Sequence, residues 1–130
     1  MATIFSRIIA GEIPCYKIAE NEKFFAFLDI NPLSKGHVLV VPKLEEDYIF
    51  NLDDNTLSEM IVFSKKIAQA QKKAIACQRI GLTVIGLEVP HAHIHLIPIN
   101  EENDMNFQRP KLKISAEELD DIASVIRKQL

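Results

Sequence analysis

Hydrophobic and polar positions recur along the chain with two different periods. In residues 56–76 apolar side chains return at three- and four-residue spacing, which predicts a long amphipathic helix. Residues 53–55, all Asp or Asn, precede it and suit the positively polarised start of a helix. A second helix is predicted from Ser115 to the C-terminus, with Ser115 and Glu118 forming a capping box.

Short apolar runs that are rich in β-branched and aromatic residues predict strands. These runs are CYKIAE and KFFAFLDI on either side of a turn at Asn21 and Glu22, then HVLVVPK, RIGLTVIG and HAHIHLIPI. TIFSRIIAGEIP predicts a short helical turn that is stopped by Gly11 and Pro14, and residues 31–36 and 100–111 are predicted to be loops. The sum is an α+β fold: about five mostly antiparallel strands, one long helix packed on the sheet and a C-terminal helix.

Length and composition add broad limits. The 130 residues favour a single domain over residues 1–130, and 48% hydrophobic with 25% charged residues is typical of soluble globular proteins. A net charge of −3 gives no indication of nucleic-acid or membrane binding. Cys15 and Cys77 are too few for a disulfide framework and are expected to be free, buried thiols. Without an evident signal peptide or membrane-spanning run, we expect a cytoplasmic protein.

The segment VPHAHIHLIPI, residues 89–99, holds three of the four histidines at every second position. On a strand, alternate side chains point to the same face. One face would therefore carry His91, His93 and His95, and the other would carry Ala92, Ile94 and Leu96. The apolar face is suited to a core. Three imidazoles in strict alternation indicate that the other face has a binding or catalytic role.

A shared metal ion is one interpretation of these imidazoles, because histidine is a common zinc ligand. On a strand, however, the first and last of the three lie roughly 13 Å apart, whereas metal–nitrogen bonds are about 2 Å long. His37 could complete such a site, but no cysteine pair and, among nearby carboxylates, only Glu88 supports it. We therefore predict no metal site.

Nucleophilic catalysis is the second interpretation. A neutral imidazole is a good nucleophile near pH 7, provided that its other ring nitrogen donates a proton to a neighbour. His93 has a histidine on each side, which makes it the favoured nucleophile, with His91 and His95 as orienting and charge-stabilising partners. A phosphoryl group is a suitable electrophile, since its transfer depends on positioning and on donors to its oxygens.

HAHIHLI resembles the His-φ-His-φ-His-φ-φ signature of the histidine triad (HIT) family of nucleotide hydrolases and transferases. The stretch from Thr3 to Lys43 is similar to the N-terminal half of that family, and Gly86 to Pro98 is similar to the triad region. The resemblance implies the HIT α+β fold, and a homodimer formed across the long helix and the adjacent strand. It also implies a reaction that needs no metal or organic cofactor.

The same resemblance implies roles for individual residues. His93 would attack the α-phosphorus of a nucleotide to give a nucleotidyl-histidine, and water would then release the nucleoside monophosphate. His91 and His95 would position the nucleophile and the phosphate oxygens, with His37 supporting them from the neighbouring strand. Asp29 would accept hydrogen bonds from the ribose hydroxyls. The apolar base pocket would be formed by Phe5, Ile8, Phe27, Ile30 and Leu39. By composition alone Phe5, Ile8, Phe27 and Leu39 would belong to the core, and turn capping is an equal alternative for Asp29.

Two features depart from the family pattern. Some members bind structural zinc through Cys-x-x-Cys and a later histidine. Thr3, Ser6 and Glu45 stand at or near those places here, so a Hint-like branch without zinc is expected. Before the triad, LTVIGLEVPHAH passes from strand to histidines with almost no loop. There Gly86 matches a family glycine that offers backbone N–H groups to phosphate. Leu87 replaces a glutamine, and Glu88 would repel phosphate or act as a general acid.

The leading hypothesis is a hydrolase of nucleoside phosphoramidates or adenylates, which makes a purine nucleotide such as an AMP conjugate the expected partner. The alternatives are a dinucleoside polyphosphate hydrolase or nucleotidyltransferase, a purine nucleotide-binding regulator with little turnover, and a metal-dependent hydrolase. Residues 100–130 match no motif of the family and read as a variable C-terminal extension. We expect this extension to close the active site of a partner chain.

Overall fold

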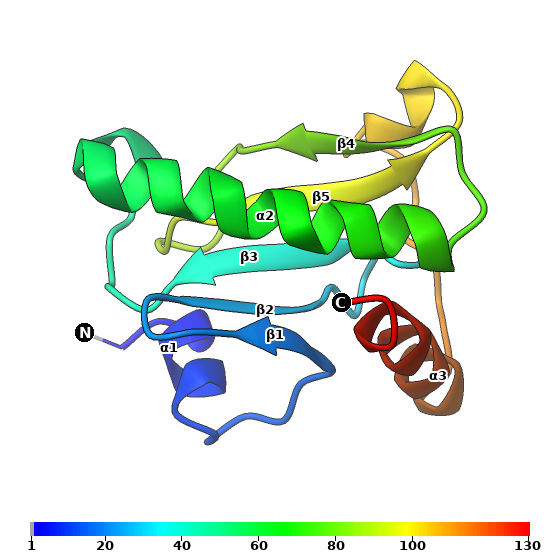
Figure 1. Ribbon diagram of the computed structural model, residues 1–130. Coiled ribbons are helices and arrows are strands. Elements are labelled where there is room, and N and C mark those ends of the chain that lie inside the picture. The colour runs from blue at the N-terminus through cyan, green and yellow to red at the C-terminus, as the bar shows by residue number, and fades with distance from the viewer. Residues whose placement is uncertain (1) are drawn as a thin grey trace.

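The computed structural model describes residues 2–130 and has the predicted α+β architecture (Figure 1). The elements are α1 (Ile4–Ile9), β1 (Lys17–Glu20), β2 (Phe24–Leu28), β3 (Val38–Pro42), η1 (Ile49–Asn51), α2 (Asp54–Ala74), β4 (Arg79–Thr83), β5 (Ile94–Ile99), η2 (Glu102–Met105) and α3 (Ala116–Arg127). The five strands form one sheet in the order β1-β2-β3-β5-β4, and all four pairings are antiparallel.

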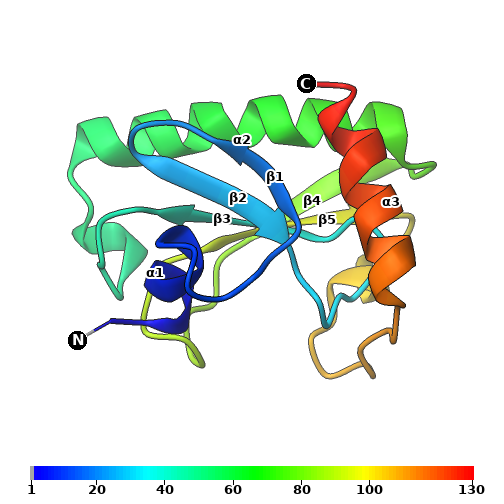
Figure 2. The same cartoon turned by 90° about the horizontal axis from the view of Figure 1, so that it is seen from below.

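The two faces of the sheet are covered differently (Figures 1 and 2). α2 lies along one face, where α3 packs against it and against β1, while α1 lies on the opposite side. The larger core fills the α2 side and includes Ala92, Ile94 and Leu96, as the alternation predicted. Gln71 of α2 fastens this layer to the sheet, because its Nε2 donates to the carbonyls of Gly36 (2.8 Å) and Leu96 (3.0 Å).

The helix boundaries follow from their caps. α2 begins two residues before the predicted start because Asp53 is the N-cap, with its carboxylate accepting from the Thr56 N–H at 2.7 Å. It ends at Ala74 rather than at residue 76. Ser115 caps α3 by accepting from the Glu118 N–H at 3.1 Å, which is one half of the predicted capping box.

β5 is shorter than predicted. It begins at Ile94, so only His95 of the triad lies on the strand itself. The ladder between β3 and β5 stops at Val40 and Ile94. Beyond that point the carbonyl of Pro42, the last residue of β3, accepts from the His91 ring instead. The expectation that one regular strand orients all three imidazoles is therefore wrong.

The connection before the triad is longer than predicted. β4 ends at Thr83 and not at residue 86, so residues 84–93 join the two strands. The expectation of almost no loop there is corrected, and the reason is the early end of both strands. Elsewhere in residues 2–130, Cys15 and Cys77 are free but only half-buried, and none of the helices is long and apolar enough to span a membrane.

Candidate active site

The hydrogen bond of His93 determines which of its nitrogens carries the proton. His93 Nδ1 lies 2.7 Å from the backbone oxygen of His91, and a carbonyl oxygen only accepts. Nδ1 therefore donates, and Nε2 of the neutral ring keeps its lone pair. Burial lowers the pKa of His93, although the hydrogen bond to His91 opposes this change. The ring is thus held neutral with a nucleophilic Nε2.

A chain of hydrogen bonds sets the opposite tautomer in His95. His37 Nδ1 accepts from the Leu33 N–H at 3.1 Å, so the proton of the neutral His37 ring is on Nε2. That Nε2 lies 3.0 Å from His95 Nδ1 and donates to it. His95 consequently carries its proton on Nε2, where it can donate to an anionic oxygen. The pKa is lowered to about 3 for His37 and about 4 for His95, in each case mainly by burial.

His91 is a buried anchor rather than a lining residue. Its side chain is fully buried, and Nε2 donates to the Pro42 carbonyl at 2.7 Å. Its Nδ1 lies 2.6 Å from the hydroxyl of Thr3. The same hydroxyl accepts from the Ser6 N–H at 3.0 Å and caps α1. Thr3 and Ser6, at the positions of the family's zinc cysteines, thus join α1 to the peptide that orients His93.

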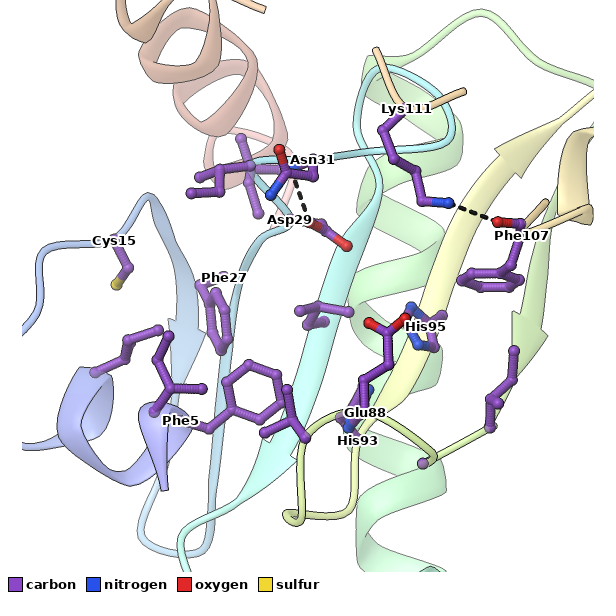
Figure 3. Close-up of a pocket in the computed structure, with 18 of the residues that line it drawn as sticks. Phe5, Cys15, Phe27, Asp29, Asn31, Glu88, His93, His95, Phe107 and Lys111 are labelled. Atoms are coloured by element: carbon purple, nitrogen blue, oxygen red, sulfur yellow. Dashed lines mark hydrogen bonds between the residues drawn. The ribbon is translucent and has the colours of Figure 1, made fainter. Parts of the chain in front are cut away.

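Four aromatic rings form a row across the site. Phe5 of α1 lies edge-on to His93, with the ring centroids 5.0 Å apart. His93 and His95 follow at 4.9 Å, and His95 and Phe107 at 4.8 Å. Two phenylalanines, one from each end of the chain, therefore flank the pair of reactive imidazoles (Figure 3).

A cavity of about 530 Å³ opens over this row. It is lined by all the residues expected from the sequence to bind a nucleotide, which are Phe5, Ile8, Phe27, Asp29, Ile30, Leu39, Gly86 and Glu88, and by His93 and His95. His37 and His91 lie behind it and act through the lining imidazoles. Phe5, Phe27 and Leu39 also belong to a small second core, so these side chains pack in that core and line the cavity as well. Ile30 is 58% exposed.

The two carboxylate oxygens of Asp29 have different neighbours. One oxygen accepts from the Asn31 N–H at 2.8 Å, which is the turn-capping role considered from the sequence (Figure 3). The other lies 3.7 Å from His37 Nε2. Because His37 is neutral, this contact is not an ion pair. Burial raises the pKa of Asp29, with the Asn31 hydrogen bond and Lys111 lowering it in part.

Residues 85–89 of the β4–β5 connection form another wall. Gly86 has a positive φ of 73°, a conformation that favours glycine. Leu87 also lines the cavity and is 88% exposed, so an apolar and solvent-accessible side chain stands at the position of the family's glutamine. Glu88 is exposed at the pocket, where its charge raises the pKa of His93 slightly, after the effects of burial and His91.

The alternative of a metal site takes a different form from the one considered on the triad. Asp29, His37 and His95 offer ligand atoms within 4.8 Å of one another. In the structure the two imidazoles of this group share a proton in the His37–His95 hydrogen bond. A cation would have to displace that proton, and with it the tautomer of His95.

Sequence reasoning missed the wall formed by the C-terminal segment. Phe107, Gln108 and Lys111 line the same cavity, which is that of their own chain. The polar run NEENDMNFQRPK resembles an ordinary surface loop. Its Phe and Lys were the only sequence signal that the segment could line a binding site. Thr3 was also missed as the partner of His91, because no local pattern joins residues so far apart in the sequence.

Comparison with known proteins agrees with this geometry. The model of the HIT domain family matches residues 10–102. An adenosine 5′-monophosphoramidase of Schizosaccharomyces pombe is 38% identical over 122 residues, which covers 92% of this chain and 91% of the relative. An uncharacterized HIT-like protein of Borreliella burgdorferi is 35% identical over 131 residues (95% and 94%). The crystal structure of a Hit-like protein from Bartonella henselae superimposes with a TM-score of 0.86 at 32% identity (98% and 96%). The chain belongs to the HIT domain family.

Proposed function

We propose that this protein hydrolyses nucleoside phosphoramidates or adenylates through a nucleotidyl-histidine and releases a nucleoside monophosphate. The observation that carries the proposal is the pair of opposite tautomers at the pocket. His93 presents a lone pair on Nε2, and His95 presents a proton on Nε2, with the ring centroids 4.9 Å apart. A phosphoryl centre requires both, a nucleophile on phosphorus and a donor to its oxygens.

The reaction has two displacements. His93 Nε2 attacks the α-phosphorus, a P–N bond forms, and the bond to the leaving group breaks with its electron pair going to that group. Water then attacks the same phosphorus and loses one proton to solvent, the P–N bond breaks, and its electron pair returns to Nε2. The His95 Nε2–H stabilises the equatorial oxygens in both steps. The apolar wall of Phe5 and Phe27 would hold a purine, and Asp29 the ribose.

The relative from Schizosaccharomyces pombe supports the substrate class, because it is named an adenosine 5′-monophosphoramidase. Three alternatives from the sequence stay open. The first is a dinucleoside polyphosphate hydrolase or nucleotidyltransferase, and the second is a purine nucleotide-binding regulator with little turnover. The second is motivated by Leu87, which removes a polar side chain from the phosphate wall. A metal-dependent hydrolase is the third.

The test is hydrolysis of a fluorogenic adenosine phosphoramidate and of a diadenosine polyphosphate, by the wild type and by His93→Ala. We expect turnover that the substitution abolishes. Hydrolysis that persists in His93→Ala contradicts the nucleophile. Clear binding of adenosine monophosphate with no turnover of either substrate favours the regulator. Loss of activity on chelation, with metal found by elemental analysis, favours the metal enzyme.

We also propose that two chains form a homodimer across α2 and the neighbouring edge strand β4. Ile61 and Val62 of α2 are 45% and 56% exposed, and Leu82 of β4 is 49% exposed. An edge strand with apolar neighbours is a surface that proteins usually cover. A second copy of the chain is the cover that the family resemblance implies.

A further inference from the structure

The strap, which we define as residues 103–111, lies beyond the part of the chain that the HIT domain model matches. It is nevertheless docked on the active site. Phe107 places its ring 4.8 Å from His95 and 6.4 Å from His37, between centroids and edge-on in both cases. The strap therefore contacts the imidazole that is expected to hold phosphate oxygens.

Further contacts fix the strap along its length. Met105 lies over β4, where a Cβ built on Gly81 would come within 2.8 Å of its sulfur, so the glycine leaves room for it. Arg109 Nη1 bonds to Asp104 Oδ1 at 3.2 Å within the strap. Just after the strap, the Leu112 N–H donates to the Pro32 carbonyl at 2.9 Å. These contacts hold the segment against its own pocket.

Lys111 brings a positive charge into that pocket. Its Nζ donates to the carbonyls of Phe107 (2.7 Å) and Arg109 (3.4 Å), and it lies 5.7 Å from the centroid of the Phe107 ring. Among the pocket-lining residues in the described part of the chain, Lys111 is the only lysine or arginine. Burial lowers the pKa of His95 most, and His93 and the Lys111 ammonium lower it further.

The position of Lys111 relative to Phe5 and Phe27 determines which part of a bound nucleotide lies near its ammonium group. Figure 3 shows Phe5 and Phe27 on one side of His95, and Phe107 and Lys111 on the other. In a nucleotide with its base at the phenylalanine wall and its α-phosphorus at His93, the ribose oxygen is the substituent on the base side. In-line attack places the leaving group opposite His93 Nε2, within the cavity that Phe107 and Lys111 also line.

We propose that Lys111 and the strap form a leaving-group subsite that selects nucleotide conjugates whose leaving group departs as an oxyanion. The inference rests on the proposed function and narrows it to acyl or phosphate adenylates and dinucleoside polyphosphates, ahead of phosphoramidates. A carboxylate or phosphate that departs takes the electron pair of the broken P–O bond and needs no proton. The Lys111 ammonium stabilises this new charge by a charge-assisted hydrogen bond.

An amine leaving group gains nothing from the same residue. When the P–N bond of a phosphoramidate breaks, the nitrogen must take up a proton, and the product is neutral or cationic. A nearby ammonium does not stabilise a neutral amine and repels a protonated one. The subsite therefore discriminates by charge between two groups of substrates that share the same nucleotide half.

The test compares diadenosine tetraphosphate with adenosine 5′-phosphoramidate on the wild type, Lys111→Met, Lys111→Arg and Lys113→Met. Methionine keeps an apolar stem of similar length without the charge, and Lys113 is an exposed lysine two residues further on. We expect Lys111→Met to lower kcat/KM for the tetraphosphate roughly tenfold, the size of one partly exposed charge-assisted hydrogen bond. The value for the phosphoramidate should change less, so that the ratio of the two kcat/KM values falls several-fold in Lys111→Met, while this ratio should stay within about twofold in Lys111→Arg and Lys113→Met. Equal changes for both substrates overturn the proposal.

A binding measurement separates this inference from the proposed reaction. In a His93→Ala background, which removes the nucleophile, calorimetry gives the ratio of the ADP and AMP affinities. We expect ADP to bind several-fold more tightly than AMP, and the ratio to fall towards one when Lys111→Met is added. A ratio that does not change overturns the subsite, even if both substrates are hydrolysed by the wild type. A ratio that falls supports the anion site, even if the wild type hydrolyses neither substrate.

Discussion

His93 Nδ1 donates a hydrogen bond of 2.7 Å to the backbone carbonyl of His91, and this contact leaves the lone pair of the neutral ring on Nε2. The orienting group is a backbone carbonyl, so side-chain substitutions at neighbouring positions leave its chemistry in place. The ring of His91 affects His93 indirectly, because its hydrogen bonds to Thr3 and Pro42 hold that peptide in place.

His93 is expected to carry the nucleotidyl group during turnover. A reaction with a diadenosine polyphosphate, quenched early, should show by intact mass a fraction of chains with one added nucleotidyl group. His93→Ala should lose the adduct and about a thousandfold or more of kcat/KM, because the covalent route is gone. An adduct that maps to any other residue would count against the assignment.

The stability of the fold should depend on pH through the buried imidazoles. Burial lowers the pKa of His37 to about 3 and of His95 to about 4, against about 6.5 in the unfolded chain. Below pH 6.5 the unfolded state takes up protons that the folded state does not. The contribution of these two imidazoles to the free energy of unfolding is therefore fully present above about pH 6.5. It falls by on the order of a few kcal/mol towards pH 4.

Urea titrations at about pH 7.5 and about pH 5 measure this fall, above the range in which most carboxylates titrate. Asp29 acts in the opposite direction, because its raised pKa makes the folded state bind a proton more readily. His37→Gln together with His95→Asn should flatten the dependence. Equal unfolding midpoints at the two pH values in the wild type would contradict the expectation.

Asp29 is expected to read the ribose. Asp29→Ala should weaken binding of adenosine monophosphate roughly tenfold to a hundredfold, the range for hydrogen bonds to a charged group. A deoxy analogue that lacks the ribose hydroxyls should lose little. Asp29→Asn keeps an oxygen for the Asn31 N–H and serves as the control for the turn. Equal losses for both ligands would assign Asp29 to the turn alone.

Thr3 is expected to stabilise both α1 and His91. Thr3→Val keeps the shape but removes the N-cap oxygen and leaves the buried His91 Nδ1 without its partner. The two losses together should cost about 2 to 4 kcal/mol in the free energy of unfolding. Thr3→Ser retains the hydroxyl and should cost less than about 1 kcal/mol. Chemical denaturation compares the two, and similar losses in both variants would contradict the role of the hydroxyl.

The homodimer predicts a definite change in mass. Light scattering at micromolar concentration should give the mass of two chains, and Ile61→Glu with Val62→Glu should give the mass of one, because two carboxylates would have to be buried in the interface. Lys113→Glu, an exposed position outside α2 and β4, is the charge control and should remain a dimer. A wild type that scatters as a single chain refutes the interface.

Periodicity was enough to predict the elements and one half of the site. The alternation of Ala92, Ile94 and Leu96 with the histidines predicted which face meets the core, and this is confirmed. The residues expected to bind the nucleotide do line one cavity. Boundaries were less well predicted, because a helix starts where a cap forms and a strand ends where its partner's hydrogen bonds are used elsewhere. Asp53 and the Pro42 carbonyl are the two examples.

The sequence by itself determined the chemistry available to this protein, since the spacing of the three histidines and the apolar runs around them record local backbone geometry and burial. Only the tertiary structure decided how that chemistry is arranged. The tautomers of His93 and His95 depend on the His91 carbonyl and on His37, and the latter contact crosses between two strands. Phe107 and Lys111 reach the pocket because the chain turns back after β5, which local preferences do not encode. Hydrogen bonds and packing between distant segments form only when the whole fold brings those segments together.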